Sequence, residues 1–410
     1  MNLLEKKSAL EAKWEFDSGM EIMSAPAIAD LDDDGLKEVI FATRTGRVCA
    51  LKSGKVMWFY DASEAMTETE KLFSGEALNS IQGSPAVADI NGDGRPEIII
   101  GCETGLLYVL SSSGKPIWRF RAGAPIRTTP LVYDIDRDGR NEIVFGTSGG
   151  SVYALDSQGK VLWGVKADSP VESSCVVIDK KSVQVIFGSN SGRVYSVSNG
   201  KLAWSFKAND KVIAAPVAGN IYGNAETFIV FGSFDKNLYV LDEGGRLCWS
   251  YSTEGKIASE ALLADINGDG KLEIIFGSCD DSVYVLSAEG RKLWSYETDF
   301  WVAAQSKAVD INQDGKMEVI AGSYDNSVYV FGAEGNFSLN YMPGLSGVMQ
   351  QPGHYTELIS AEVGSYIGKL LLRYNAGGIV TGISVAKERG GEMVVVATGN
   401  GKIIELQHKR

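Results

Sequence analysis

A pattern of about 45 residues recurs along the chain and limits the possible folds more than any other feature of the sequence. Tryptophans mark it, because from Trp118 to Trp294 the successive steps are 45, 41, 45 and 45 residues, mostly within Gly-Lys-x-x-Trp. Between two tryptophans come a strand of small residues, an acidic turn, an apolar strand and an alternating strand. Each repeat therefore predicts four short strands separated by turns, which is one blade of a β-propeller.

The repeats predict a single all-β domain over residues 1–410, an eight-bladed β-propeller of four-stranded antiparallel blades. The eighth copy, from Gly377 to Gln407, has only three predicted strands, so we expect the segment around Trp14 to supply its outer strand. This pairing of the two chain ends closes the ring and leaves no open sheet edge. A seven-bladed ring with the last segment as an appendage is the alternative. The other seven copies are predicted at 22–60, 81–121, 126–166, 171–207, 212–252, 257–297 and 302–341.

Two segments interrupt the repeat and are predicted to be insertions. Residues 62–80 are polar and lie between the first and second blades. Residues 342–376 lie between the seventh and eighth blades and are predicted to form an irregular loop with one or two extra strands. Because both join the outer strand of one blade to the inner strand of the next, we expect both on the same face of the disc.

Five repeats carry an acidic turn of the form Asp-x-Asp/Asn-x-Asp-Gly-x-x-Glu. Ca²⁺ takes about six to eight oxygen ligands, and side-chain oxygens at positions one, three, five and nine of such a turn can converge on one point. The glycine at position six permits a sharp turn with positive φ. An EF-hand differs because its closing acid comes later and helices flank its loop. The predicted ligands are Asp30, Asp32, Asp34, Glu38, Asp89, Asn91, Asp93, Glu97, Asp134, Asp136, Asp138, Glu142, Asp265, Asn267, Asp269, Glu273, Asp310, Asn312, Asp314 and Glu318.

Such a turn also forms without an ion, because Asp, Asn and Gly favour turns. Five copies at the same point of the repeat favour the ion, since crowded carboxylates repel one another unless a cation lies among them. The sequence therefore predicts about five Ca²⁺ sites. The fourth, fifth and eighth repeats lack the acidic pattern, and no metal is expected there.

Composition narrows the possible partners and compartments. A net charge of −13 argues against nucleic acid, and no apolar run approaches the ~20 residues of a membrane span, so membrane insertion is not expected. Five cysteines without a close pair and only two histidines argue against a disulfide framework or a zinc site. The first ten residues lack the apolar core of a signal peptide. A native start at Met1 would favour the cytoplasm, and a trimmed signal would favour an extracellular or periplasmic location.

The acidic turns and the apolar strands that follow them resemble FG-GAP/VCBS-type repeats, the calcium-loop propeller repeats that also occur in integrin α-chains. The stretch ALDSQGKVLW, from Ala154 to Trp163, resembles the tryptophan-docking motif of quinoprotein-type (PQQ-like) propellers. Together the resemblances cover nearly the whole chain outside the two insertions. They imply calcium loops and tryptophans packed between blades, and they constrain function weakly because such folds host unrelated activities. Quinoprotein dehydrogenases hold their quinone beside a vicinal disulfide; this shorter chain has no Cys-Cys pair, so no quinone is expected.

The face opposite the acidic turns is predicted to carry the loops between second and third strands. In repeats five to seven these loops read SFDKN, SCDDS and SYDNS, and they combine acids with aromatic residues. Carboxylates with aromatic faces suit a basic peptide or a sugar ring. The candidate partner-binding residues are Phe234, Asp235, Glu260, Asp280, Asp281, Trp301, Gln305, Tyr324 and Asp325.

These patterns lead to three functional hypotheses. The leading one is a calcium-stabilised, non-catalytic propeller that serves as a scaffold for protein or peptide partners. The alternative is a carbohydrate-binding or polysaccharide-cleaving propeller, in which Asp280, Asp281 and Glu260 would act as acid and base. A quinone-dependent oxidoreductase is the third.

Overall fold

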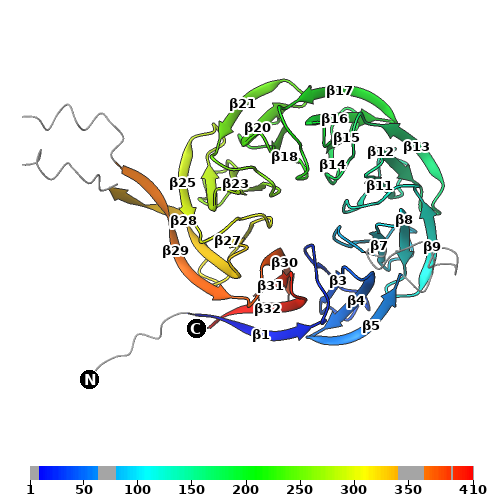
Figure 1. Cartoon of the computed structure of the whole chain (residues 1–410), viewed down its shortest axis with the longest axis horizontal. Helices are drawn as coiled ribbons and strands as arrows, with labels where there is room; N and C mark the ends of the chain where they lie inside the picture. Colours follow the sequence, from blue (N-terminus) through cyan, green and yellow to red (C-terminus); the bar gives the residue numbers. More distant parts are fainter. Residues whose placement is uncertain (1–8, 63–79, 340–363, 389–390, 410) are drawn as a thin grey trace, which may run out of the picture.

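The described part of the chain forms 32 strands arranged as a closed ring of eight blades (Figure 1). The computed structural model describes residues 9–62, 80–339, 364–388 and 391–409. No helix occurs among these residues, and accordingly none of them forms a helix of the length and apolarity that crossing a bilayer requires. The all-β, eight-bladed propeller predicted from the repeats is therefore confirmed.

The first six blades each contain four consecutive antiparallel strands, ordered from the inside of the ring to its rim. Blade one has β2 (Ala27–Ala29), β3 (Glu38–Ala42), β4 (Arg47–Lys52) and β5 (Lys55–Asp61). Blade two has β6 (Ala86–Ala88), β7 (Glu97–Gly101), β8 (Leu106–Leu110) and β9 (Pro116–Arg121). Blade three has β10 (Leu131–Tyr133), β11 (Glu142–Gly146), β12 (Ser151–Leu155) and β13 (Val161–Lys166). Blade four has β14 (Val176–Asp179), β15 (Val183–Gly188), β16 (Arg193–Ser198) and β17 (Lys201–Lys207). Blade five has β18 (Val217–Gly219), β19 (Phe228–Gly232), β20 (Asn237–Asp242) and β21 (Leu247–Ser252). Blade six has β22 (Leu262–Ala264), β23 (Glu273–Gly277), β24 (Ser282–Leu286) and β25 (Lys292–Glu297).

The two ends of the chain meet in blade eight. Its inner strands are β30 (Val380–Glu388), β31 (Gly391–Thr398) and β32 (Lys402–Lys409), and β1 (Ala9–Asp17) is its outer strand. β1 runs antiparallel to β32, with Ala9 opposite Lys409 and Asp17 opposite Lys402. The predicted ring closure is thus confirmed, and the seven-bladed alternative is wrong.

Blade seven differs from its prediction in its outer strand. It contains β26 (Lys307–Val309), β27 (Glu318–Gly322), β28 (Ser327–Leu339) and β29 (Gly364–Asn375). Residues 364–375 were expected to belong to an insertion between blades seven and eight, but they pair along β28 as the fourth strand of blade seven. The interruption therefore lies within blade seven, between its third and fourth strands. The signal was hidden because this outer strand carries no Gly-Lys-x-x-Trp phrase.

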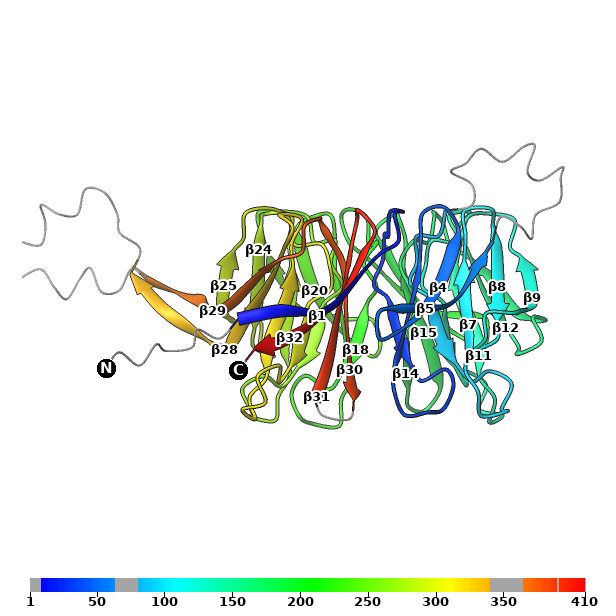
Figure 2. The same cartoon turned by 90° about the horizontal axis from the view of Figure 1, so that it is seen from below.

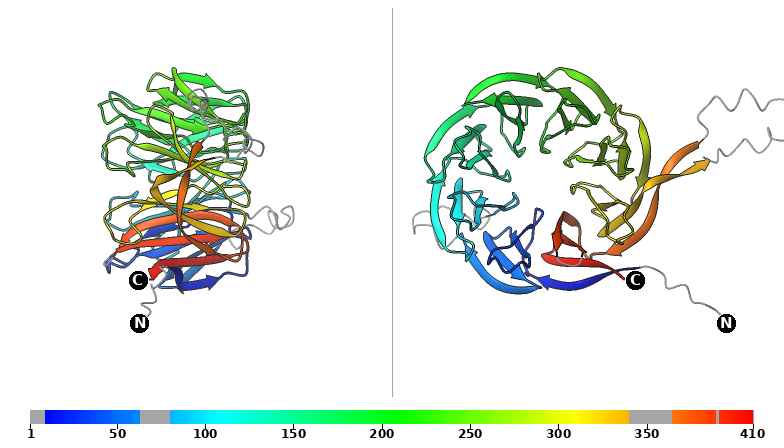
Figure 3. Two further views of the ribbon diagram at one scale, coloured as in Figure 1. Left: turned by 90° about the vertical axis from the view of Figure 1, so that its left-hand side faces the viewer. Right: turned by 180° about the vertical axis from the view of Figure 1, so that it is seen from behind.

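The β28–β29 hairpin continues past the rim of the ring (Figure 3). β29 also contacts β25 of blade six through one parallel bridge, Ser295 to Ile367, which joins blades six and seven into one eight-stranded sheet. Of the predicted insertion 62–80, only Ala62 and Ser80 are among the described residues. Residues 340–363, which include the start of the other predicted insertion, lie outside them.

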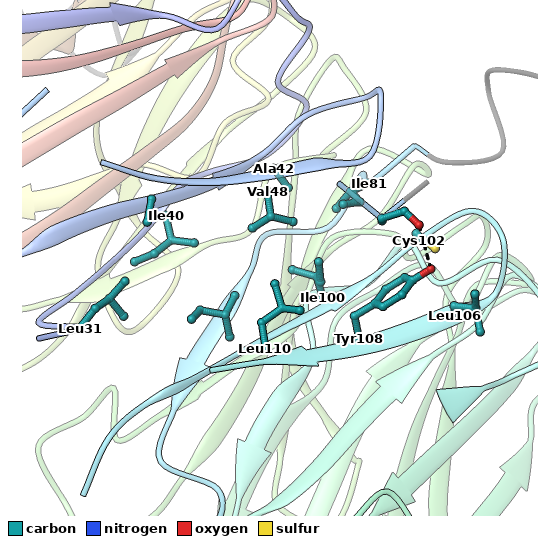
Figure 4. Packing of buried hydrophobic residues seen from close by; sticks show 13 residues of the cluster. Leu31, Ile40, Ala42, Val48, Ile81, Ile100, Cys102, Leu106, Tyr108 and Leu110 are labelled. Atoms are coloured by element: carbon teal, nitrogen blue, oxygen red, sulfur yellow. Dashed lines mark hydrogen bonds between the residues drawn. The ribbon is translucent and has the colours of Figure 1, made fainter. Parts of the chain in front are cut away.

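The hydrophobic core lies between adjacent blades, where the second and third strands of one blade face those of the next. Strands such as β3, β7, β11, β19, β23 and β27 are buried along their whole length, as continuous apolar runs require. One such seam joins blades one and two, where Ile40 and Val48 pack toward Ile100 and Tyr108 (Figure 4). Tyr108 donates a hydrogen bond to the carbonyl of Ala62 and so ties the end of blade one to blade two (Figure 4).

The tryptophans of the repeat lie on the outer strands and close these seams at the rim. In four seams the indole Nε1 donates to a backbone carbonyl of the next blade, at 2.9 or 3.0 Å; the donor and acceptor pairs are Trp58 and Ser112, Trp118 and Ser157, Trp204 and Glu243, and Trp294 and Ala333. The rings lie close to glycines of the facing hairpins, since a Cβ at Gly114 would come within 2.5 Å of the Trp58 ring. The repeated glycine is therefore required by close approach of the indole as well as by the turn.

Candidate metal loops and binding face

Five turns between first and second strands carry the acidic pattern, and all lie on one face of the disc (Figure 2). We name them after their blades: loop one is 30–38, loop two 89–97, loop three 134–142, loop six 265–273 and loop seven 310–318. All five share one backbone conformation, with φ between 60° and 80° at position four and between 83° and 88° at the glycine of position six. Such left-handed turns favour glycine, which explains the invariant spacing of the pattern within this chain.

Hydrogen bonds to two acidic side chains hold each loop in shape. The aspartate at position one accepts the amide of the position-six glycine at 2.8 or 2.9 Å. The glutamate at position nine accepts the amide of position two at 2.7–3.2 Å and is at most 3% exposed. Position two is a buried Leu or Ile that anchors the loop to the seam. In loops one and three, oxygens of this buried glutamate and of the aspartates at positions one and three lie within 4.8 Å of one another.

Loop three has a carboxylate at all four ligand positions and, unlike loop one, has no lysine across the hairpin that follows it. Ligand oxygens of Asp134, Asp136 and Glu142 lie within 4.8 Å of one another. Burial, together with the charges of Asp136, Asp138 and Asp134, raises the pKa of Glu142 to about 7, although the hydrogen bond from the Ile135 amide opposes this rise. Like charges held this close favour a cation, and an all-oxygen set suits Ca²⁺.

Loops two, six and seven carry asparagine at position three. Its Nδ2 donates to the position-nine glutamate at 2.8–3.0 Å in each loop, as between Asn91 and Glu97. An amide presents oxygen on its other side, so a half-turn of the side chain offers a neutral ligand to a cation. Burial raises the pKa of Glu97, Glu273 and Glu318, and that of Glu318 reaches about 7.

Loop one has the same backbone but a different electrostatic balance. The Lys52 ammonium lies 2.7 Å from Asp32 Oδ2, 2.6 Å from Asp34 Oδ2 and 3.1 Å from Glu38 Oε1. The first two contacts are hydrogen bonds, and the third is an ion pair outside hydrogen-bond geometry. Hydrogen bonds to Asp32 and Asp34 raise the pKa of Lys52. Sequence comparison of the turns alone missed this lysine because it lies in the next hairpin.

In two of the repeats that lack the acidic pattern, other hydrogen bonds hold the equivalent turn. In blade four, Asp179 accepts from the Arg137 guanidinium of loop three and, at 2.8 Å, from the Tyr133 hydroxyl. In blade five, the amide of Asn224 donates to Asn220 Oδ1 at 2.9 Å, so a neutral carboxamide takes the role of the position-one aspartate.

On the opposite face, three of the candidate partner-binding acids are engaged within the protein. Asp235, Asp280 and Asp325 each accept from the tyrosine hydroxyl four residues later, Tyr239, Tyr284 or Tyr329. Each also accepts a backbone amide from the end of the preceding blade, at 2.8–3.2 Å. These carboxylates organise the turns between second and third strands. Asp281 lies beside Asp280 in the same turn, with φ of 66°.

The exposed aromatic group of this face is Phe300 with Trp301. Their rings stack at 5.2 Å and 19°, with 46% and 44% of each residue exposed. The carbonyl of Trp301 accepts the amide of Tyr324 at 2.9 Å, which fixes the pair against the blade-seven turn. Nearby, Arg373 pairs with Asp299 at 2.8 Å. Arg373 was not among the candidates, because a single basic residue outside the repeat gives no periodic signal.

Another candidate, Phe234, lies under the ammonium of Lys256, which is 5.0 Å from the centre of its ring. Burial raises the pKa of Tyr324. Together these contacts place aromatic rings and basic side chains side by side on blades five to seven.

Glu260 and Gln305 lie at the central axis rather than on the rim of this face. They line a cavity of about 680 Å³ that all eight blades border with mostly small and apolar residues. Lys307 donates to Gln305 and faces Glu260. Burial lowers the pKa of Lys307, against the opposing charge of Glu260, and burial raises the pKa of Glu260.

Glu172, which also lines this cavity, shares Arg127 with a further acid, Glu103. The Arg127 guanidinium lies 2.6 Å from Glu103 and 2.6 Å from Glu172. Sequence reasoning missed Arg127, Glu172 and Lys307, because their proximity depends on the ring bringing distant repeats together.

Several solved structures share this fold. BamB from Moraxella catarrhalis is 17% identical, with 98% of each chain covered and a TM-score of 0.65. Sqt1 from Saccharomyces cerevisiae is 10% identical, with 98% of this chain and 99% of that chain covered and a TM-score of 0.68. BBS1N, solved in complex with ARL6DN, is 11% identical, with 98% of each chain covered and a TM-score of 0.56. At these identities the likeness concerns the fold alone. No match to this chain was found among the curated proteins.

Family models match two parts of the chain. An FG-GAP-like repeat matches residues 30–100, which contain loops one and two, so the predicted resemblance to these repeats is confirmed there. The lambda-carrageenase β-propeller domain matches residues 130–199, 184–248 and 242–341, which together span more than half of the 410 residues. The chain therefore belongs to the family of the lambda-carrageenase β-propeller domain.

Proposed function

We propose that the protein is a non-catalytic, calcium-stabilised scaffold that binds a protein partner on the face opposite the acidic loops. The observation that carries this proposal is the exposed, stacked Phe300–Trp301 pair beside the Arg373–Asp299 ion pair. Aromatic and arginine side chains dominate binding energy at protein interfaces, and surrounding charged pairs form a polar rim. BBS1N, which has the same fold, was solved in complex with ARL6DN.

The scaffold role accords with how the acids of this face are used. The carboxylates of Asp235, Asp280 and Asp325 accept hydrogen bonds from neighbouring tyrosines and amides. A general acid or base needs to reach a substrate proton within about 3 Å, directly or through water. Acids committed to turns instead favour a rigid surface that presents the aromatic pair.

The partner proposal is tested by replacing Phe300 and Trp301 with alanine. Partners captured by the wild-type protein are identified and purified, and their Kd is measured. We expect the double variant to bind at least ten-fold more weakly, since interface aromatics contribute about 2 kcal/mol or more. Phe59→Ala is the matched control, because Phe59 is 59% exposed but lies on the outer strand of blade one. Equal affinity of the double variant and the control would contradict the proposal.

Calcium binding by the acidic loops is the other half of the proposal. Loop three supplies four carboxylates, and loops two, six and seven each supply three carboxylates and one carboxamide. A bound Ca²⁺ would neutralise these charges and link two inner strands of a blade. Metal analysis after dialysis tests this, together with calorimetric titration of the chelated protein. A calcium-free protein that shows no heat of binding would refute it.

A carbohydrate ligand is the second candidate, favoured by the same exposed ring pair and by membership of a family described from lambda-carrageenase. Sugar rings stack on exposed aromatic faces. Titration with carrageenan oligosaccharides tests it, with Trp301→Ala as the comparison. Binding that Trp301→Ala abolishes would favour this candidate over a protein partner.

A further inference from the structure

Loop one holds a cation that belongs to the protein. We propose that the ammonium of Lys52 replaces Ca²⁺ in this loop, so that loop one is metal-independent and at most four loops bind an ion. The inference rests on the proposed calcium binding of loops two, three, six and seven. It differs from the expectation that Asp30, Asp32, Asp34 and Glu38 form a fifth calcium site.

The contacts of Lys52 occupy the positions that a metal would use. Its ammonium contacts one oxygen each of Asp32, Asp34 and Glu38, at 2.6–3.1 Å. These are positions three, five and nine, three of the four side chains expected to bind Ca²⁺. An ammonium carries three donors and no acceptor, so one oxygen from each acid matches its capacity. A Ca²⁺ at this point would have to displace the lysine.

Strand register explains why only loop one has this lysine. Glu38 and Lys52 are a cross-strand pair between β3 and β4. In the other four blades, the same register continued by one residue beyond the paired strands places Ser111, Asp156, Ser287 and Gly332 opposite the position-nine glutamate. None of these side chains is cationic. The difference therefore lies in the residue facing the loop, since the five loop backbones are alike.

The hairpin that carries Lys52 leaves this side chain free for the loop. Lys52 and Lys55 pair across a two-residue turn, Ser53–Gly54, whose φ values of 48° and 74° suit a type I′ hairpin. In blade three the turn is longer, and Asp156 holds it by accepting the amides of Gln158 and Lys160 at 3.0 and 2.9 Å. The two-residue turn of blade one does not depend on a side-chain hydrogen bond from this position, so Lys52 is available to contact the acids of loop one.

Covalent attachment gives the lysine an advantage over a free ion. A tethered group acts at an effective concentration of about millimolar, whatever the calcium level. We therefore expect loop one to bind Ca²⁺ at least ten-fold more weakly than loop three, and to keep its shape in chelator.

The test compares calcium stoichiometry in wild type and two exchanged variants, by calorimetric titration and metal analysis of the full chain. Lys52→Ser installs the residue type found in blades two and six, and it should raise the stoichiometry from four to five. Ser111→Lys places an ammonium opposite Glu97 and should lower it from four to three. Lys52→Arg keeps a cation beside loop one, and Ser113→Lys adds the same charge at an exposed turn position; both should leave it at four.

The outcomes separate this inference from the calcium proposal itself. Five ions in wild type and in Lys52→Ser, or four ions in both, would overturn the role of Lys52 while leaving calcium binding intact. No ion in wild type but one in Lys52→Ser would support the role of Lys52 and overturn calcium binding by the other loops. No ion in either protein would overturn both. Hydrogen exchange adds an independent readout: in chelator, the amides of loop one should be protected in wild type and lose protection in Lys52→Ser.

Discussion

Loops one and three have the same backbone and the same four acidic positions, but they differ in the residue across the hairpin. Loop one faces Lys52, whose ammonium contacts three of its acids. Loop three faces Asp156, which adds a further negative charge nearby. The comparison teaches that the turn pattern specifies the backbone, and under our proposal the cross-strand residue decides whether lysine or Ca²⁺ neutralises the acids.

The largest expected effect on stability concerns the tryptophans that pack on the two hairpins carrying Lys52 and Asp156. The indole of Trp118 packs on the blade-three hairpin and donates to Ser157 at 3.0 Å, whereas Trp14 packs on the blade-one hairpin and its buried Nε1 has no hydrogen-bond partner. We expect Trp118→Ala to lower the free energy of unfolding by about 3 kcal/mol. Trp14→Ala should cost about 1 kcal/mol less, because no hydrogen bond is lost. Urea denaturation of both variants measures this, and equal losses would contradict the hydrogen-bond assignment.

Removing calcium should destabilise loop three but have little effect on loop one. A ligand present at 100 times its Kd stabilises the native state by about 2.7 kcal/mol. Chelation should therefore accelerate amide exchange in residues 134–142 and leave residues 30–38 nearly unchanged. Hydrogen exchange with and without chelator, at equal ionic strength, measures this contrast. Similar acceleration in both segments would mean that Lys52 does not stand in for the ion.

The comparison also shows what sequence could and could not predict. The ring, its closure and the five acidic loops follow from local patterns, because strand alternation, turn glycines and spacing are written into each repeat. The outer strand of blade seven was assigned to an insertion, since β29 lacks the repeat's tryptophan and follows a long interruption. Its place depends on pairing with β28, which no local pattern records.

The candidate sites depended still more on contacts between distant residues. The pairing of Lys52 with Glu38 could be found from sequence only by aligning the hairpins as well as the turns. The sequence gives no sign that Asp235, Asp280 and Asp325 have partners within the protein. Only the folded structure shows that their carboxylates accept hydrogen bonds from tyrosine hydroxyls and backbone amides. The stacking of Phe300 on Trp301 is likewise a property of the folded loop.

In chelator, neutralising the buried glutamate should change the free energy of unfolding with opposite signs in the two loops, whereas in calcium both changes should be destabilising. In chelator, Glu142→Gln removes repulsion among the acids of loop three and should raise the free energy of unfolding, but in calcium it should lower it by about 1–2 kcal/mol through loss of a charged ligand. Glu38→Gln should cost about 1 kcal/mol in both conditions, because Lys52 keeps Asp32 and Asp34 as partners. Denaturation curves with and without calcium measure the four values. A calcium-dependent cost for Glu38→Gln would indicate a metal in loop one.

The smallest expected effect concerns position four, where both loops place a non-glycine residue in the left-handed region. Asp33 has φ of 60° and Arg137 has φ of 64°, whereas loops two and six have glycine there. Asp33→Gly should relieve this strain and, after the entropic cost of glycine, stabilise the protein by about 0.5 kcal/mol. Arg137→Gly gains the same relief but loses the exposed ion pair to Asp179, so it should stabilise the protein less than Asp33→Gly does. Differences in urea midpoint resolve the two variants. If Arg137→Gly stabilised the protein as much as Asp33→Gly, the bridge from loop three to blade four would contribute nothing, and the loops would then differ only in the residue that faces them.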